Sequence, residues 1–174
     1  MAVNIEVKAA LADWDSAWRT AERLSGSAGH RLEQIDTFFH CPAGRLKLRR
    51  LGENRGELIV YDRPDQEGPK TSHYRVARTG DPDALLAILS GVLETKGTVA
   101  KTRWVFLVGQ TRIHLDCVEG LGEFLELEVV LCPGQPEEEG RGIAAALMRE
   151  FAIDPASLVR GSYFDLLTNP QAGS

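Results

Sequence analysis

The chain has 174 residues, of which 43% are hydrophobic and 26% charged, and its formal net charge is −5. These values suit one globular domain long enough to bury a core, and the excess of acids argues against general nucleic-acid binding. No apolar segment typical of a signal peptide follows the start, and no run approaches the ~20 apolar residues that span a bilayer. The three cysteines include no CxxC pair and are expected to be reduced thiols. We therefore expect a cytoplasmic protein with no membrane or nucleic-acid partner.

The first half of the chain predicts a strand, a helix and then four strands. Residues 4–8 alternate polar and apolar side chains, as a half-buried strand does. Residues 12–24 form an amphipathic helix whose apolar stripe carries Trp14 and Trp18, which we expect to pack against the sheet, and Gly26 follows as a stop signal. The four later strands cover residues 31–41, 45–51, 57–64 and 71–78, with short turns between the first three.

The second half of the chain alternates helical and strand patterns. Residues 81–93 predict a helix that is capped by Asp81 and has Pro82 in its first turn. An acidic stretch opens a further amphipathic helix over residues 137–152. Three strands cover residues 98–108, 111–118 and 123–131, a short helix begins in 154–159, and residues 162–167 close the chain.

These elements predict an α+β fold: an eight-stranded antiparallel β-barrel with helices packed outside. Most connections between strands are too short for the crossovers that parallel pairing needs. Eight antiparallel strands in one domain also favour a closed or nearly closed barrel. We expect one domain over residues 1–170 and a flexible tail over residues 171–174.

Charged side chains share one face on strand after strand, because alternate residues of a strand point to the same side. One strand aligns Arg45, Lys47 and Arg49, and another aligns Glu126 with Glu128. The remaining strands align Lys101 with Arg103, Arg63 with Tyr61, Arg75 with His73, and Arg112 with His114 and Asp116.

Each such face could be the wet side of a sheet whose other side packs on helices. Like charges this close repel one another, however, so clusters of one sign favour a shared ligand of opposite sign. Bases suit a polyanion, and paired carboxylates suit a divalent cation such as Mg²⁺, which is commonly held by carboxylates and substrate phosphates together. The pattern therefore indicates a phosphate-chain site with a metal on the inner face of the barrel.

Six segments of the chain, in order, resemble the CYTH domain, the family of triphosphate tunnel metalloenzymes. They are "NIEVK" for E-x-E-x-K, "DTFF" for D-T-Y-F, "GRLKLRR" for a basic strand, "KTRW" for K-x-R, "IHLDCVEGLGEFLELEV" for an Asp strand, GLG turn and E-x-E strand, and "SYFDLL" for S-Y-x-D-L-L. The resemblance covers nearly the whole chain. The family includes class IV adenylyl cyclases, thiamine triphosphatases and inorganic tripolyphosphatases.

The resemblance implies a tunnel that binds a triphosphate compound or nucleotide together with Mg²⁺ or Mn²⁺. Lys8, with Glu6, would act on the reacting or leaving phosphate or orient water. The implied metal ligands are Glu6, Asp116, Glu126 and Glu128. The implied phosphate-binding bases are Lys47, Arg49, Arg63, Lys101 and Arg103, with Arg75 and Arg112 added.

Three other residues have expected roles outside these three groups. Tyr163 and Asp165, in the closing segment, are expected to close one mouth of the tunnel. His114 lies between Arg112 and Asp116 on one face, so hydrogen bonding inside the tunnel and a catalytic role are alternatives for it.

Asn4 departs from the family pattern, because it stands where the first motif glutamate is expected. An amide oxygen can ligate a hard cation but brings no negative charge, so this departure concerns catalytic rate and the number of metals. We favour a phosphohydrolase acting on an organic or inorganic triphosphate, because no adenine-reading motif is evident. The alternatives are a class IV adenylyl cyclase and a non-catalytic protein that binds a nucleotide or another phosphorylated metabolite. We also allow for a homodimer.

Overall fold

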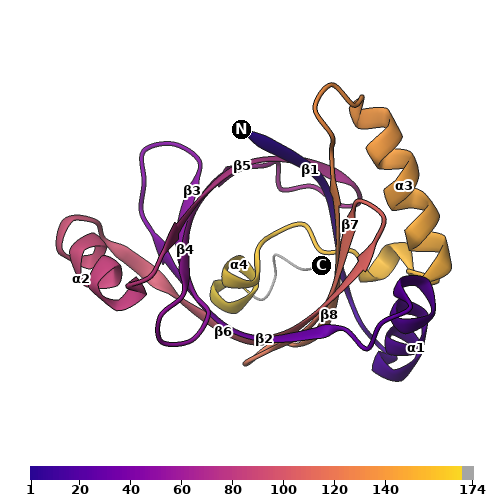
Figure 1. Cartoon of the computed structure of the whole chain (residues 1–174), viewed down its shortest axis with the longest axis horizontal. Helices are drawn as coiled ribbons and strands as arrows, with labels where there is room; N and C mark the ends of the chain where they lie inside the picture. The colour runs from indigo at the N-terminus through magenta and orange to yellow at the C-terminus, as the bar shows by residue number, and fades with distance from the viewer. Residues whose placement is uncertain (170–174) are drawn as a thin grey trace.

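The computed structural model describes residues 1–169, and its eight strands close into one antiparallel barrel (Figure 1). This confirms the expected fold class; the tail over residues 171–174 lies outside the described residues. The strands are β1 (Ala2–Ala10), β2 (His30–Phe39), β3 (Arg45–Arg50), β4 (Gly56–Asp62), β5 (Lys70–Thr79), β6 (Thr95–Val108), β7 (Thr111–Val118) and β8 (Gly122–Val130).

The helices agree with the sequence pattern, apart from the segment after residue 153. Asp13 caps the first helix by accepting from the Ser16 N–H, and Gly26 ends it in the left-handed conformation that glycine adopts easily. The expected short helix near residue 155 is a single 3-10 turn, η1. No helix within residues 1–169 is long and apolar enough to cross a membrane. The helices are α1 (Trp14–Ser25), α2 (Pro82–Val92), α3 (Glu137–Glu150), η1 (Pro155–Ser157) and α4 (Tyr163–Thr168).

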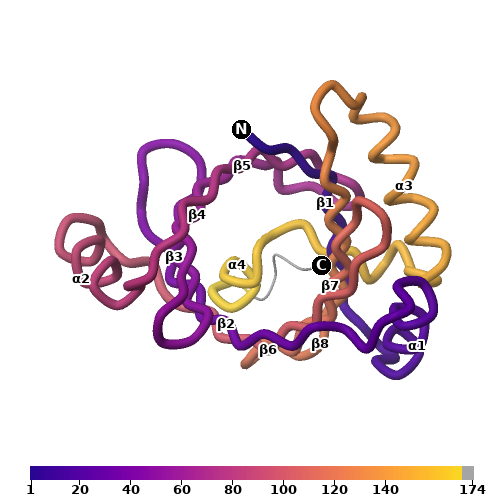
Figure 2. Tube along the Cα trace, viewed as in Figure 1, coloured from indigo at the N-terminus to yellow at the C-terminus, as the bar shows by residue number. Residues whose placement is uncertain are grey.

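The order of the strands around the barrel follows from two meanders. Strands β2 to β5 form one meander, strands β6 to β8 form another, and β2 pairs with β6. Strand β1 lies between β5 and β8 and closes the barrel, as the trace in Figure 2 lets the reader follow. The alternating segment that begins the chain is therefore in contact with both meanders.

The apolar core lies outside the barrel, between its wall and two helices. The outward side chains of β1, β6, β7 and β8 pack under α1 and α3, which flank that side of the ring in Figure 1. Trp14 and Trp18 pack edge-on against Trp104 with ring centroids 5.4 and 5.8 Å apart, as expected for helix–barrel packing. Because these strands bury their apolar face outward, their alternating polar face must point into the barrel.

A second apolar cluster closes one end of the barrel. Figure 1 shows α4 within the ring, and its residues Tyr163 and Leu166 are buried against Phe38 and Phe124. Tyr163 and Phe124 have ring centroids 4.9 Å apart. The closing segment therefore plugs one mouth, which leaves the polar interior accessible from the opposite mouth.

Two glycines of α3 provide a matched test of how closely this helix packs on the barrel. A Cβ at Gly140 would lie 2.5 Å from Leu131 Cδ2 and 2.8 Å from Ile5 Cγ1, whereas a Cβ at the exposed Gly142 would meet nothing within 4 Å. We expect Gly142→Ala to raise the free energy of unfolding by roughly 0.5–1 kcal/mol, because alanine favours the helix. Gly140→Ala should instead lower it by about 1–3 kcal/mol through overpacking.

Chemical denaturation of the two variants measures both effects. If Gly140→Ala raised the free energy of unfolding as much as Gly142→Ala does, this result would contradict the close packing of α3 on β1 and β8.

A charged tunnel as the candidate functional site

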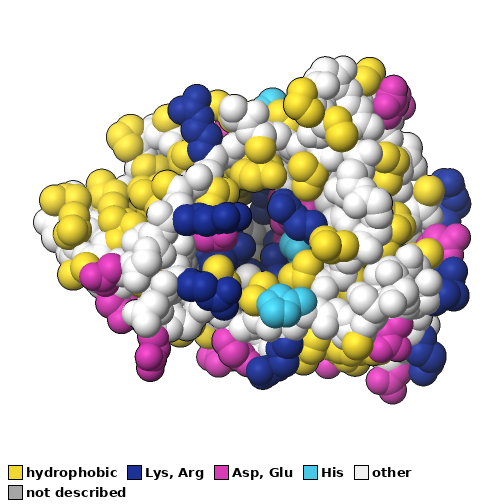
Figure 3. Space-filling model, in the orientation of Figure 1, with side chains coloured by type: hydrophobic (Ala, Val, Ile, Leu, Met, Phe, Trp, Pro, Cys, Tyr) yellow, Lys and Arg dark blue, Asp and Glu magenta, His cyan; other side chains and the backbone are white. Residues whose placement is uncertain are grey.

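A cavity of about 1130 Å³ runs along the inside of the barrel. Figure 3 shows it as the hollow at the centre of the molecule, with Lys, Arg, His and hydrophobic side chains around its rim. At its closed end the cavity is lined by Ser162 and Tyr163, which precede and begin α4. The side chains that line its wall are the inward-facing members of all eight strands.

A single carboxylate, Asp36, holds three cations in the tunnel wall. Arg49 donates to it from Nε at 2.8 Å and from a second guanidinium nitrogen at 2.9 Å, and Lys47 donates at 2.9 Å. Lys101 Nζ lies 3.6 Å from the same carboxylate. Burial raises the pKa of Asp36, but these three cations outweigh it and hold the pKa well below its usual range. Asp36 was not among the site residues expected from sequence, although it opens the "DTFF" segment.

A second buried ion pair joins Arg103 to Asp116. The guanidinium donates to both carboxylate oxygens at 2.6 and 2.5 Å, and the Tyr163 hydroxyl donates to the carboxylate at 2.8 Å. Burial raises the pKa of Asp116, but Arg103 and Lys101 lower it by more, so the group is held below its usual pKa. Asp116 is fully buried behind Arg103 and does not itself line the cavity.

The carboxylate of Glu126 lies where the charges of three strands meet. It pairs with Arg103, and Lys8 Nζ lies 3.3 Å from its other oxygen. Lys8 also sits over the ring of Tyr163, 3.9 Å from the centroid. Burial raises the pKa of Glu126, but Lys8, Arg103 and His114 hold it well below its usual range. The carboxylate is therefore ionised at neutral pH.

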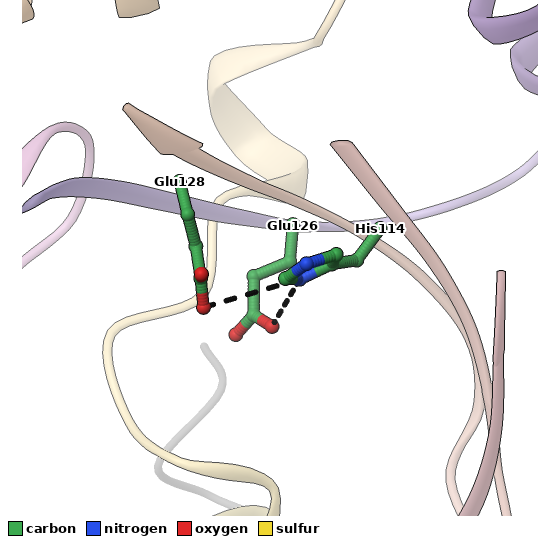
Figure 4. A group of neighbouring side chains, drawn as sticks. All are labelled: His114, Glu126 and Glu128. Carbon is green, nitrogen blue, oxygen red and sulfur yellow. Dashed lines mark hydrogen bonds and ion pairs between the residues drawn. The ribbon is translucent and has the colours of Figure 1, made fainter. Parts of the chain in front are cut away.

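His114, Glu126 and Glu128 form the group of donors that could hold a metal ion (Figure 4). One donor atom from each lies within 4.8 Å of the others, and the side chains come from the neighbouring strands β7 and β8. His114 Nδ1 is 3.5 Å from Glu126 and 3.9 Å from Glu128. The alternation of side chains along residues 111–118 predicted that His114 shares a face with Arg112 and Asp116. Only the register of β7 on β8 brings His114 beside both glutamates.

Strand β1 contributes two polar side chains beside this group. Glu6 lies opposite Glu128 in the register and pairs with Arg63 at 3.6 Å. Asn4 is 4% exposed and lines the cavity, and its Oδ1 has no hydrogen-bond partner among the described residues. A buried polar atom without a partner is costly unless a ligand or water satisfies it, so this oxygen is a further available donor.

The structure brings most of the expected site residues together and leaves one outside. Arg75 is exposed and shares the outer face of β5 with His73, whereas Ser72, Tyr74 and Arg78 on the same strand line the cavity. Neither face of β5 is apolar, so the sequence does not fix which face is turned inward. The expected residues that line the cavity are Glu6, Lys8, Lys47, Arg49, Arg63, Lys101, Arg103, Arg112, Glu126 and Glu128.

Lys70 is a buried cation that the sequence pattern did not single out. It is 0% exposed, and its ammonium donates to the carbonyls of Val159 at 3.0 Å, Arg160 at 2.8 Å and Gln66 at 3.3 Å. Burial, with Arg63 and Lys8 nearby, lowers its pKa to about 8. Lys70 therefore fastens the segment before α4 to the barrel and positions the plug.

Comparison with known proteins places this geometry in a family. The model of the CYTH domain matches residues 2–163. The chain belongs to the CYTH family. Among curated proteins none matches it.

Solved structures share the CYTH fold at low sequence identity. The PH1012 protein of Pyrococcus horikoshii superimposes with a TM-score of 0.81 at 23% identity, over 94% of this chain and 98% of that one. A candidate adenylate cyclase of Vibrio parahaemolyticus gives 0.76 at 20% identity, over 95% and 97%. A chain of the Schizosaccharomyces pombe Mediator head module gives 0.66 at 6% identity, over 87% and 96%. The CYTH barrel thus recurs in proteins of different kinds, and the function must be argued from the tunnel.

The cation cluster of the CYTH tunnel should destabilise the free protein. Burial, with Arg103 and Arg49 nearby, lowers the pKa of Lys101 to about 7 despite Asp36. An unfolded lysine keeps its proton to about pH 10.4. Between about pH 7 and pH 10.4, Lys101 binds more protons in the unfolded chain than in the folded protein. The free energy of unfolding therefore rises with pH over this interval, and the buried ammonium destabilises the folded protein most below pH 7. We expect Lys101→Met to raise the thermal midpoint by several degrees at pH 6.5.

The gain from Lys101→Met should shrink as the pH is raised toward 10, which urea denaturation at several pH values measures. Lys96→Met, an exposed position on the same strand, is the control and should change stability little. A loss of stability in Lys101→Met at pH 6.5 would contradict the assigned charge balance.

Proposed function

We propose that the protein is a divalent-metal-dependent enzyme that acts on a triphosphate compound, with hydrolysis of a phosphoanhydride bond as its reaction. One observation carries this proposal: buried and half-buried lysines and arginines from β1, β3, β6 and β7, with Arg63 directly after β4, line one tunnel that also holds a carboxylate and imidazole group. Cations in such numbers fit a polyanion. Membership of the CYTH family supports the same substrate class.

The bases would bind the phosphate chain and neutralise its charge. Lys47, Arg49 and Lys101 surround Asp36 in the tunnel wall. Arg103 follows Lys101 by two residues on β6 and therefore points into the tunnel on the same face. Arg63 lines the same cavity at its closed end, and Arg112 lines it toward its open mouth. The guanidinium groups suit bidentate contacts with phosphate oxygens, and the ammonium groups act as point charges. Catalysis of phosphoryl transfer depends mainly on this positioning and charge neutralisation.

The residues present fit a divalent cation. Carboxylate and amide oxygens are the donors that Mg²⁺ and Mn²⁺ prefer, and Mn²⁺ also accepts imidazole. Glu126, Glu128 and His114 would hold the ion, and the free Oδ1 of Asn4 lines the same cavity. Both Asp116 oxygens are engaged by Arg103 and Tyr163, so Asp116 would act by orienting Arg103 rather than as a ligand. When bound, the metal would supply charge neutralisation to the phosphate chain.

Lys8 and Glu6 would act at the reacting end of the phosphate chain. Lys8 projects between Glu126 and Tyr163 at the closed end, where its ammonium can stabilise the charge that develops on the leaving or transferred phosphate. Glu6 faces the same space from β1 and can orient a water molecule for in-line attack on the terminal phosphorus. A bond forms between the water oxygen and that phosphorus while the bond from the phosphorus to the bridging oxygen breaks. The proton lost by the water would pass to the Glu6 carboxylate, and the negative charge of the leaving oxygen would lie among the tunnel cations.

Asn4 favours one alternative function, a protein that binds a triphosphate without turning it over. The amide leaves the donor group one negative charge short of the family pattern, and a weaker metal site can support binding while slowing chemistry. A class IV adenylyl cyclase remains the other alternative, because the same tunnel can present the α-phosphorus of ATP to its ribose hydroxyl.

Phosphorus NMR separates these functions. The purified protein is incubated with tripolyphosphate, thiamine triphosphate or ATP, each with Mg²⁺ or Mn²⁺. Release of orthophosphate supports the phosphohydrolase, and pyrophosphate with cyclic AMP from ATP supports the cyclase. Binding by calorimetry without any product would contradict the enzyme and support the binding protein.

The donor group can be tested without any substrate. We expect Glu126→Gln with Glu128→Gln to weaken Mn²⁺ binding at least about tenfold, because two charged oxygen donors are lost. The signal of free Mn²⁺ in electron paramagnetic resonance measures the affinity. His114→Gln should weaken the same binding by a smaller factor if the imidazole is a ligand. Glu123→Gln, an exposed position on the same strand, should leave it unchanged.

Wild-type Mn²⁺ affinity in the double variant would remove the metal assignment, provided that circular dichroism shows an intact fold. Restoring the acid with Asn4→Glu should tighten Mn²⁺ binding, because the new carboxylate joins the same cavity.

A further inference from the structure

The ring of Tyr163, the first residue of α4, lies against two tunnel lysines that come from different strands. Lys8 Nζ on β1 lies over the ring, 3.9 Å from its centroid, and Lys101 Nζ on β6 lies over it at 5.1 Å. All three residues are buried. A cation over an aromatic face is attracted by the negative charge of that face, and the attraction is strongest where water is excluded. The ring is therefore a shared contact of two buried cations.

The hydroxyl of Tyr163 reaches a third tunnel cation through Asp116. It donates to the Asp116 carboxylate at 2.8 Å, and the same carboxylate accepts from Arg103 at 2.6 and 2.5 Å. Burial and the nearby charge of Asp116 raise the pKa of Tyr163 well above its usual value, so the hydroxyl keeps the proton that it donates. One side chain thus contacts Lys8 and Lys101 directly and Arg103 through a single carboxylate.

The carboxylates alone do not fix where the two ammonium groups lie. Lys8 Nζ is 3.3 Å from Glu126, and Lys101 Nζ is 3.6 Å from Asp36, which also pairs with two other cations. An ammonium on a flexible four-carbon stem can keep such a contact from several positions. The ring of Tyr163 gives each ammonium a second contact, and two contacts restrict its position more than one does.

The barrel wall and α4 itself hold the backbone around Tyr163. Lys70 donates to the carbonyl of Val159 at 3.0 Å, four residues before the ring. Ser162 and Asp165 then form a capping box at the start of α4, in which each side chain accepts from the backbone N–H of the other residue. The ring therefore has its position before any ligand binds, as a preorganised site requires.

The next residue of α4 separates the contact with lysines from the filling of the barrel end. Phe164 packs on Phe38 with ring centroids 5.3 Å apart and does not line the cavity, whereas Tyr163 does. Within residues 1–169 no lysine or arginine lies over the ring of Phe164. If Tyr163 only filled the end of the barrel, changing either residue would have the same kind of effect.

We propose that Tyr163 is a positioning residue, whose ring holds Lys8 and Lys101 at the spacing in which both meet one phosphate chain. Its hydroxyl orients Arg103 toward the same chain through Asp116. This inference rests on the proposed function, since it assumes that these cations bind phosphates. The closing segment is then part of the phosphate site as well as the plug of the tunnel.

NMR of the lysine side chains tests the positioning without any ligand. Isotope-labelled lysine reports the ε-methylene protons, and the ring current of Tyr163 displaces them upfield when they lie over the ring. We expect Lys8 to be displaced more than Lys101, because it lies closer to the centroid, with the exposed Lys96 as the reference. Lys8→Arg and Lys101→Arg assign the two signals. Tyr163→Phe should retain both displacements, and Tyr163→Leu should remove them.

Phe164→Leu is the control for a loosened plug and should leave both displacements in place. Unchanged displacements in Tyr163→Leu would overturn the inference. An equal loss in Phe164→Leu would also overturn it, because the ring would then act only by seating α4. Should Tyr163→Leu fail to fold, a wild-type Lys8 signal at the position of the Lys96 signal would still overturn it.

Calorimetry with tripolyphosphate and Mg²⁺ connects the positioning to the proposed function. We expect Tyr163→Leu to weaken binding about tenfold and Tyr163→Phe less than about threefold, because phenylalanine keeps the ring under both lysines. Phe164→Leu should stay within about twofold of the wild type. Wild-type affinity in Tyr163→Leu, or equal weakening by Phe164→Leu, would overturn the inference and leave the proposed function standing. If the wild type did not bind tripolyphosphate, the proposed function would fail, while the lysine signals would still decide whether Tyr163 positions the two ammonium groups.

Discussion

The structure depends on neutralising a set of cations that the barrel has taken out of water. Burying lysine and arginine side chains beside one another is unfavourable unless carboxylates accompany them. Asp36 does this for Lys47, Arg49 and Lys101, and Asp116 with Glu126 does it for Arg103. Each of these carboxylates is held below its usual pKa by its partners, so the charge balance persists at neutral pH. The tunnel is thus an ion-pair network before any ligand binds.

This network requires the barrel to keep its polar face inside and its apolar face outside. The apolar outer face then needs cover, which α1 and α3 provide over β1, β6, β7 and β8. The close seating of α3 on the wall is possible because Gly140 has no side chain to hold it away. The same arrangement makes the chain ends structurally important, since β1 closes the wall and α4 closes one mouth.

Much of this arrangement could be predicted from the sequence, because alternation within a strand reports which residues share a face. It identified the Lys47–Arg49, Lys101–Arg103 and Glu126–Glu128 walls, all of which line the cavity. It assigned Arg75 to the tunnel because β5 is polar on both faces, and there only the pairing with β1 and β4 decides which side turns inward. Alternation within one strand also does not predict which side chains of different strands contact one another. The three cations on Asp36 and the carbonyls around Lys70 depend on register and on a segment about 90 residues later in the chain.

The distribution of carboxylates suggests how the tunnel can hold charge and still accept a ligand. Asp116 is 0% exposed and does not line the cavity, so it supports Arg103 without facing a ligand, whereas Asp36 lines the cavity but is paired with three cations. Glu126 and Glu128 line the cavity and would repel phosphate if nothing intervened. A divalent ion between them and a phosphate chain would remove that repulsion, and Lys8 already lowers it in the free protein. Asn4, being neutral, adds an oxygen beside this group without adding repulsion. Under the proposed function, the amide would therefore make the tunnel less dependent on metal for binding a polyanion, while it would weaken the negative field that could hold a further ion for chemistry.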